Sequence, residues 1–326
     1  MVELNSDYSP AWWLTNPHLQ TLWGKFLRRA PIQPTTLERL DTPDGDFLDL
    51  HHLDGPEGAP LLVLLHGLEG GIHSHYIQGL LGEARFRGWQ ATAIVFRSCG
   101  ADMNRTRRSY HSGETTDLEL VLNHLILRHP SSPLLLAGAS LGGNVLLKYL
   151  GEQGRNIRRN IKGAVAISVP FDLGKASRHI GQGFARIYQR NFLRSLRRKA
   201  RIKLEHYPDL FPQERLARAE TLFDFDDVFT APVHGFVDAD DYYSRSSSLK
   251  FIDRISINTL LLSAVDDPFL PSQVLDAVRE IARKNACVRL EFTQHGGHVG
   301  FVARGSPLKP AYYLEKRTGD FLAQLV

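Results

Sequence analysis

Short apolar runs alternate with longer segments of helical periodicity from about residue 61 to residue 293. The runs are bounded by glycine, proline and polar residues, and their length predicts buried strands. These strands are expected at residues 60–67, 91–96, 133–138, 161–169, 258–265 and 287–293. The helical patterns between them are clearest at residues 115–129, 141–153 and 272–285. Apolar strands that alternate with helices predict an α/β fold, in which helices cover both faces of a mostly parallel sheet.

Two segments depart from this alternation. Residues 170–254 are long, charged and mostly helical in pattern, as expected of an insertion between two strands of the sheet. We expect this insertion to form a helical cap, or lid, over the site. Residues 1–35, which contain Trp12, Trp13 and Trp23, lie outside the sheet pattern and form an N-terminal arm. The 326 residues are therefore predicted to form a single domain with these two additions.

The composition is that of a soluble globular protein, with 43% hydrophobic and 23% charged residues. Cys99 and Cys287 are too few for a disulfide framework, so a reducing compartment is expected. No run reaches the roughly 18 apolar residues that span a bilayer. The first residues carry acids instead of the basic region of a signal peptide. These features predict a cytoplasmic protein without a transmembrane segment.

The formal net charge is +4, and much of the basic excess lies at residues 190–203. We favour the interpretation that these basic residues form the solvated face of one helix. Peripheral contact with an anionic membrane surface is the alternative. No zinc-finger or RNA-binding signature accompanies the basic run, so nucleic acid is not an expected partner.

One helical segment of the insertion separates apolar from basic positions. The apolar positions recur near helical spacing at Phe184, Ile187, Phe192, Leu193 and Leu196. Arginines fall largely between them, and such a helix buries one stripe while it solvates the other. We expect the apolar stripe to face the site, so that the substrate carries a hydrophobic acyl group.

Ser140 lies between a strand pattern and a helical pattern, in the sequence Gly138-Ala139-Ser140-Leu141-Gly142. The G-x-S-x-G spacing is typical of a nucleophilic serine on a sharp turn from a strand into a helix. Such a turn strains the serine backbone and leaves no room for side chains at Gly138 and Gly142. It exposes the hydroxyl at the carboxyl end of the sheet, where the helix N-terminus favours developing negative charge. We therefore expect Ser140 to be a nucleophile.

A serine nucleophile needs a base, and the base needs a carboxylate that orients it. Asp266 and Asp267 follow the strand predicted at residues 258–265. His295 and His298 follow the last predicted strand. The order serine, acid, histidine is the one this type of site requires. The residues alone leave two candidates for each role.

The loop after the first predicted strand reads Leu65-His66-Gly67-Leu68-Glu69-Gly70-Gly71. A tetrahedral intermediate needs two N–H donors, and we expect the backbone N–H groups of Leu68 and Leu141 to supply this oxyanion hole. His66 and Gly67 are expected to shape the loop, with His66 as a hydrogen-bonding residue and not as the base. His73 and His75 resemble a metal-binding pair but lack further ligands at suitable spacing, so we expect no metal and no other cofactor.

Several segments together identify a family resemblance. They are "NPHLQTLWG", "LLHGLEGG", "HSHY", "FRSCGADMNRTRRSYHSGET", "GASLGGN", "DDVFTAPVHGF", "DDYYSRSS", "DDPFLP" and "HGGHVGF". The chain resembles the YheT-like branch of the α/β-hydrolase superfamily, which is similar to eukaryotic α/β-hydrolase-domain lipases and esterases. The resemblance implies that Ser140 is the nucleophile, Asp267 the acid before the proline and His298 the base after the glycine pair. Ser98 departs from the glycine that such proteins tend to have there, and the membrane anchor of some eukaryotic relatives is not expected.

These observations predict a serine hydrolase that cleaves carboxylic esters through an acyl-enzyme intermediate. Ser140 Oγ and a ring nitrogen of His298 are expected to lie within hydrogen-bonding distance. The same residues would serve a thioesterase or an amidase, and the tryptophans and basic run favour a lipase or phospholipase acting on a lipid-like acyl substrate. A non-catalytic binding protein on a hydrolase scaffold is the alternative of another class.

Overall fold

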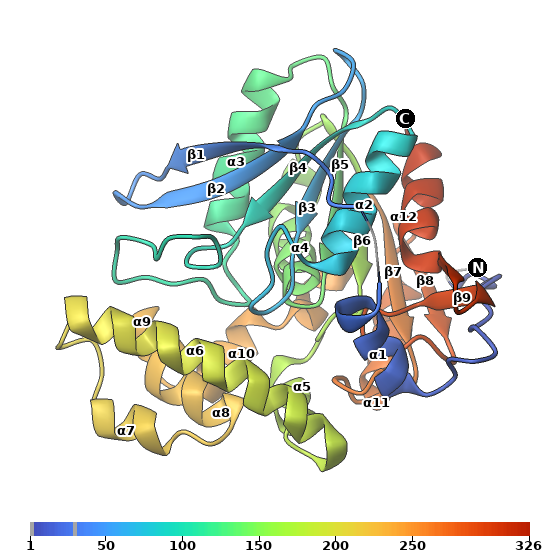
Figure 1. Cartoon of the computed structure of the whole chain (residues 1–326). Helices are drawn as coiled ribbons and strands as arrows, with labels where there is room; N and C mark the ends of the chain where they lie inside the picture. Colours follow the sequence, from blue (N-terminus) through green and yellow to red (C-terminus); the bar gives the residue numbers. More distant parts are fainter. Residues whose placement is uncertain (1–2, 29–30) are drawn as a thin grey trace.

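The computed structural model describes residues 3–28 and 31–326. Its centre is an eight-stranded sheet with the order β1-β2-β4-β3-β5-β6-β7-β8 (Figure 1). The strands are β1 (Thr36–Asp41), β2 (Phe47–Leu53), β3 (Leu61–Leu65), β4 (Gln90–Val95), β5 (Leu134–Ala139), β6 (Ile161–Ile167), β7 (Asn258–Ala264) and β8 (Val288–Thr293). The six strands from β3 to β8 are parallel, whereas β1 and β2 add an antiparallel edge. The predicted mostly parallel α/β fold is confirmed.

Helices cover both faces of the sheet because the central strands are apolar on both. In β3, Leu61, Val63 and Leu65 pack on one face, and Leu62 and Leu64 pack on the other. The first face is covered by α3 (Thr116–Arg128), α4 (Leu141–Gln153) and α11 (Gln273–Ala282). The second is covered by α2 (His75–Phe86) and α12 (Tyr313–Ala323).

The segment between β6 and β7 is helical throughout most of its length and forms a separate layer below the sheet (Figure 1). Its α-helices are α5 (Leu173–His179), α6 (Arg186–His206), α7 (Gln213–Arg218), α8 (Leu222–Phe225), α9 (Ala231–Val233) and α10 (Ala239–Ser246). Shorter helical turns are η2 (Gly183–Ala185), η3 (Asp226–Thr230, a π-helix) and η4 (Ser248–Arg254). Two apolar clusters of its own stabilise this segment, which we call the helical insertion.

The apolar stripe predicted along α6 is only partly correct. Leu193 and Leu196 are buried, and Phe192 is half-buried. Phe184 and Ile187 are each 53% exposed, so the expectation that they face inward is wrong. Phe184 lies in η2, before α6 begins, and therefore does not follow the phase of that helix.

The N-terminal arm packs against the end of the sheet through α1 (Pro17–Phe26). Asn16 caps this helix by accepting hydrogen bonds from the N–H groups of His18 and Leu19. The arm also contacts the small hairpin of β9 (Val302–Ser306) and β10 (Lys309–Tyr312). Among the described residues, no helix is long and apolar enough to cross a membrane.

Candidate active site

Ser140 is the single residue between β5 and α4, and its backbone is strained. Its φ of 53° and ψ of −122° lie where a residue with a side chain is rarely found. A β-carbon added to Gly138 would lie 2.5 Å from the carbonyl oxygen of Gly142. One added to Gly142 would lie 2.5 Å from the carbonyl oxygen of His66. The turn therefore has this sharpness only with glycine on both sides of the serine.

Asp267 and His298 follow the carboxyl ends of β7 and β8 and meet each other. His298 Nδ1 lies 2.8 Å from Asp267 Oδ2, and both side chains are more than nine-tenths buried. A carboxylate can only accept, so Nδ1 of His298 donates this bond, and in the neutral imidazole Nε2 is the acceptor. Asp267 Oδ1 is held by the N–H of Phe269 at 2.8 Å, and the Phe269 ring stacks on the imidazole at 4.1 Å.

Ser140 and His298 line one pocket, but the hydrogen bond that we expected between them is not formed among the described residues. Their side chains come from different strand ends, and the serine hydroxyl turns about a single side-chain bond. Catalytic hydrogen bonds are often long in the free enzyme and tighten around the reacting substrate. The structure thus brings Asp267 into contact with His298, and places His298 and Ser140 in the same pocket.

Asp266 and His295 form a second acid–histidine pair outside this pocket. His295 Nδ1 lies 3.2 Å from Asp266 Oδ2, and the His295 side chain is 51% exposed. Asp266 also accepts a hydrogen bond from the N–H of Gly297 at 2.9 Å. This pair organises the loop that leads to His298, and its histidine does not line the pocket.

The sequence profile of the α/β hydrolase fold matches residues 60–304. The chain belongs to that family. The Escherichia coli (strain K12) protein named "Putative esterase YheT" is 38% identical over 98% of this chain and 93% of its own. The human protein named "Phospholipase ABHD3" is 28% identical over 99% of this chain and 80% of its own. The solved structure of Pyrococcus furiosus esterase Pf2001 superimposes with a TM-score of 0.60 at 17% identity, covering 99% of both chains, and shows the fold alone. These findings confirm the predicted family and show a hydrolase with relatives named esterase and phospholipase.

The hydrolase has a loop after β3 that offers an unused N–H donor beside the serine. The N–H of Gly67 donates to the Tyr76 hydroxyl at 2.7 Å, and that of Glu69 donates to the Tyr110 hydroxyl at 3.0 Å. Within residues 3–28 and 31–326, the intervening N–H of Leu68 has no protein acceptor. The N–H of Leu141 opens α4 and, at the first turn of a helix, lacks an intrahelical acceptor. Both residues line the pocket with Ser140.

His66 fixes the shape of this loop as a neutral imidazole. Its Nε2 accepts the N–H of Phe96 at 3.1 Å, so its Nδ1 carries the proton and donates to the carbonyl of Gly67 at 2.7 Å. Burial lowers the pKa of His66 to about 4. Both ring nitrogens are therefore engaged, which agrees with a structural role for His66.

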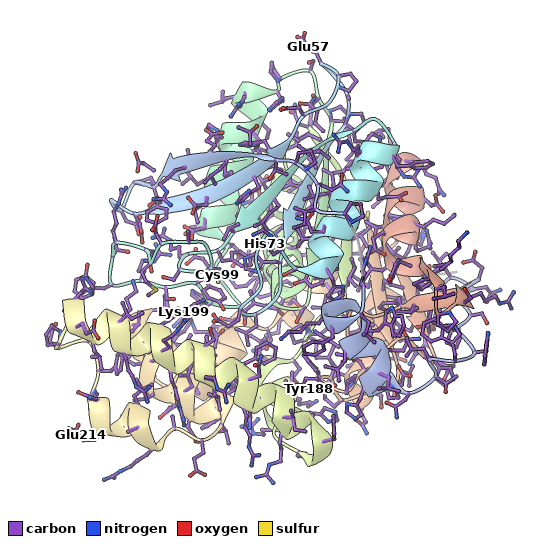
Figure 2. The ribbon with its side chains drawn as sticks, viewed as in Figure 1. Glu57, His73, Cys99, Tyr188, Lys199 and Glu214 are labelled. Atoms are coloured by element: carbon purple, nitrogen blue, oxygen red, sulfur yellow. The ribbon has the colours of Figure 1, made fainter. Side chains whose placement is uncertain are left out.

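The loop is also tied to the helical insertion, a connection that the sequence did not reveal. Glu69 Oε1 accepts hydrogen bonds from the Tyr110 hydroxyl and from Lys199 Nζ of α6, each at 2.7 Å. Lys199 Nζ also lies 3.5 Å from Cys99 Sγ, and Figure 2 shows these two residues side by side between α6 and the body. The Glu69 side chain is 7% exposed and that of Lys199 is 17% exposed. The buried ion pair therefore links α6 to the residue next to Leu68.

The pocket is mainly apolar, and the insertion supplies much of its lining. The apolar lining from the insertion comprises Leu173, Ala176, Ile180, Phe192, Leu196, Leu222, Phe225 and Phe229. Leu68, Leu141, Phe269 and Leu270 come from the body of the protein. Ser140 and His298 line the same pocket as these two sets of apolar residues.

Besides Lys199, the charged residues Asp226 and Lys203 of the insertion line the pocket. Asp226 accepts hydrogen bonds from the hydroxyls of Thr230 and Tyr243, and burial raises its pKa to about 6. Lys203 donates to the backbone carbonyl of Arg108 at 2.8 Å, and burial lowers its pKa to about 8. Neither residue was singled out from the sequence.

The N-terminal arm holds the loop of His298 in place, which the sequence did not predict either. The N–H of His298 donates to Thr21 Oγ1 of α1 at 2.9 Å. A β-carbon on Gly297 would lie 2.5 Å from the carbonyl oxygen of Pro17. The buried Gln20 bonds both the N–H and the carbonyl group of Val302, just beyond this loop. The segment "NPHLQTLWG" was the available signal, because it contains these contacts.

His73 and His75 do not assemble a metal site in the part of the chain that the structure describes, where no group of three potential ligands is found. His75 begins α2 and packs against Gly24 of α1. Burial lowers the pKa of His75 to about 3, which keeps its imidazole neutral.

Ser98 occupies a left-handed conformation, with φ 62°, and its hydroxyl bonds the Asn104 side chain. A left-handed conformation favours glycine, and the bond to Asn104 helps to hold serine in it here.

Proposed function

We propose that this chain is a serine hydrolase that cleaves carboxylic esters through an acyl-enzyme intermediate. The observation that carries the proposal is the Asp267–His298 pair, in which Nδ1 of His298 is engaged by the carboxylate, in the pocket that Ser140 lines on its strained turn. His298 takes the proton of Ser140 while Oγ attacks the ester carbonyl, and it then protonates the leaving alcohol. Water, deprotonated by His298, attacks the acyl group and releases the acid.

The N–H groups of Leu68 and Leu141 stabilise the oxyanion in this proposal, since both lie beside Ser140 and neither has another acceptor in the described structure. Asp267 keeps the proton of His298 on Nδ1 and stabilises the imidazolium that forms. Gly138 and Gly142 permit the turn. No cofactor takes part in these steps.

The helical insertion serves as a cap in this proposal, and the whole chain as one α/β-hydrolase domain. The cap supplies the apolar lining, which favours an ester with a hydrophobic acyl group. A lipase or phospholipase is the second candidate, because the same lining accepts an acyl chain and the related proteins carry the names "Phospholipase ABHD3" and "Monoacylglycerol lipase". A location in the cytoplasm remains a prediction.

The test is reaction with a fluorophosphonate probe, followed by turnover of p-nitrophenyl esters of increasing chain length. We expect labelling, and a kcat/KM that rises from acetate to butyrate or longer chains. The corresponding thioester and anilide measure the preference for the leaving group. Folded protein that neither reacts with the probe nor hydrolyses any of these substrates would favour a binding protein.

Removing the charge of Lys199, which links α6 to the loop after β3, should impair the chemical step. We expect Lys199→Met to lower kcat about tenfold with little change in KM, because displacement of the loop misplaces the N–H of Leu68. Glu69→Gln should act in the same direction, and Lys199→Arg should restore much of the rate because it keeps the charge.

Lys175→Met is the control, since Lys175 is an exposed lysine of the same insertion. Steady-state kinetics on p-nitrophenyl butyrate and thermal unfolding of each variant make the comparison. A fall in thermal stability with unchanged kcat would show that the ion pair is structural and does not position the loop.

A further inference from the structure

The outer face of α6 carries a continuous row of arginines. Its members are Arg186, Arg190, Arg194, Arg197, Arg198 and Arg201. At about 100° per residue, these six positions fall within an arc of about 120° of the helix surface. The opposite side of α6 contributes Phe192, Leu196 and Lys199 to the pocket. We call the outer arc the arginine face.

The guanidinium groups of the arginine face have no partners. Within the described residues, none of the six forms a salt bridge or a side-chain hydrogen bond, whereas Arg178 and Arg215 of the same insertion are paired with aspartates. Two acids accompany the face, Glu205 on α6 and Glu220 on the rim of the shallow groove that the arginines line. Six positive charges less two negative charges leave +4, which equals the formal net charge of the whole chain.

Exposed apolar side chains lie beside these charges. Ile187 falls inside the same arc and is 53% exposed. Phe184, in the turn that leads into α6, is also 53% exposed and contacts His18 of α1 at a ring separation of 4.6 Å. A helix that lies in a bilayer surface combines basic residues with apolar ones in this way, and an aliphatic side chain such as that of Ile187 does not stack on nucleic-acid bases.

We propose that the arginine face docks on an anionic lipid bilayer. The guanidinium groups would contact lipid phosphates, and Ile187 and Phe184 would enter the boundary between headgroups and acyl chains. The opposite side of α6 lines the pocket, so this docking holds the pocket about one helix diameter from the bilayer surface. The surface proposal stands on the charges and exposures alone and does not depend on the proposed catalytic mechanism.

The experiment is flotation of the full chain with vesicles, at low ionic strength and again in salt. One set of vesicles is pure phosphatidylcholine, and the other contains about one third phosphatidylglycerol. We expect binding to the anionic vesicles only, and its loss as salt rises. The triple variant Arg190→Gln, Arg194→Gln, Arg198→Gln should lower the partition coefficient about a hundredfold, since each arginine near such a surface contributes about a factor of five.

A charge-matched triple variant provides the control. Arg155, Arg159 and Arg304 are exposed and lie outside the helical insertion. Changing them to glutamine should leave vesicle binding almost intact, and Ile187→Ser should weaken it without removing its salt dependence. The proposal would be overturned if the wild-type chain failed to bind anionic vesicles at low salt, or if both triple variants lost binding equally. Tighter binding to a single-stranded RNA than to the vesicles would also overturn it, in favour of a nucleic-acid surface.

Discussion

Ser140→Ala should abolish reaction with a fluorophosphonate probe and lower ester turnover by about five orders of magnitude. The covalent intermediate requires an oxygen nucleophile at the carboxyl edge of the sheet, and alanine supplies none. Alanine keeps the β-carbon, so the turn at φ 53° should persist and the protein should stay folded. Labelling, turnover of p-nitrophenyl butyrate and thermal unfolding of the purified variant measure the three effects.

Ser177→Ala is the matched control, because Ser177 also lines the pocket and is largely buried. Its hydroxyl bonds the carbonyl of Gly174 at 3.1 Å and does not lie at a strained turn. This variant should keep its labelling and most of its activity. Labelling that survives in Ser140→Ala and disappears in Ser177→Ala would place the nucleophile in the insertion.

The parallel half of the sheet was predictable because its strands are apolar on both faces. A strand that is buried on both faces has an unbroken run of apolar residues. These runs predicted the bounds of β3 to β8 within a few residues. The antiparallel edge was not predicted. In β1 every residue is exposed or half-exposed, and in β2 the polar residues Asp49, His51 and His52 interrupt the apolar pattern. An edge strand depends on its neighbour for stability, and a local pattern does not contain that neighbour.

The position of Ser140 could be predicted because the turn requires glycine two residues before and two residues after the serine. The sequence has Gly138 and Gly142 at these positions. The choice between Asp266 and Asp267 could not be made from spacing, since adjacent residues at a strand end point in different directions. That choice depends on the loop geometry, in which Gly296 and Gly297 take positive φ values of 150° and 59°. It also depends on α1, whose Thr21 holds the backbone of His298.

The link between Glu69 and Lys199 shows a different limit. The two residues are separated by 130 positions, and neither belongs to a catalytic motif. The helical phase of α6 correctly separates Leu196 from the arginines, but it does not show that Lys199 reaches the loop after β3. Ile187 has an apolar side chain and nevertheless falls within the arginine arc, so residue type alone gave the wrong side of the helix.

The two aspartates provide the sharpest test of the catalytic assignment, because they are neighbours of the same type with different partners. Asp267→Asn should lower kcat by about four orders of magnitude, as loss of the orienting carboxylate does in serine hydrolases. An amide can donate to Nδ1 and move the imidazole proton to Nε2, where it can no longer accept the proton of Ser140. Asp266→Asn should cost less than about tenfold, since it weakens contacts with His295 and Gly297 but leaves the buried pair intact.

Each variant is to be compared with the wild-type chain in kcat, KM and the rate of probe labelling. Thermal unfolding should change little in either, because asparagine has the size of aspartate. A loss of kcat in Asp266→Asn equal to that in Asp267→Asn would mean that the first pair acts in catalysis. A large loss in Asp266→Asn alone would assign the acid to Asp266 and the base to His295, although His295 is half-exposed and does not line the pocket in the structure.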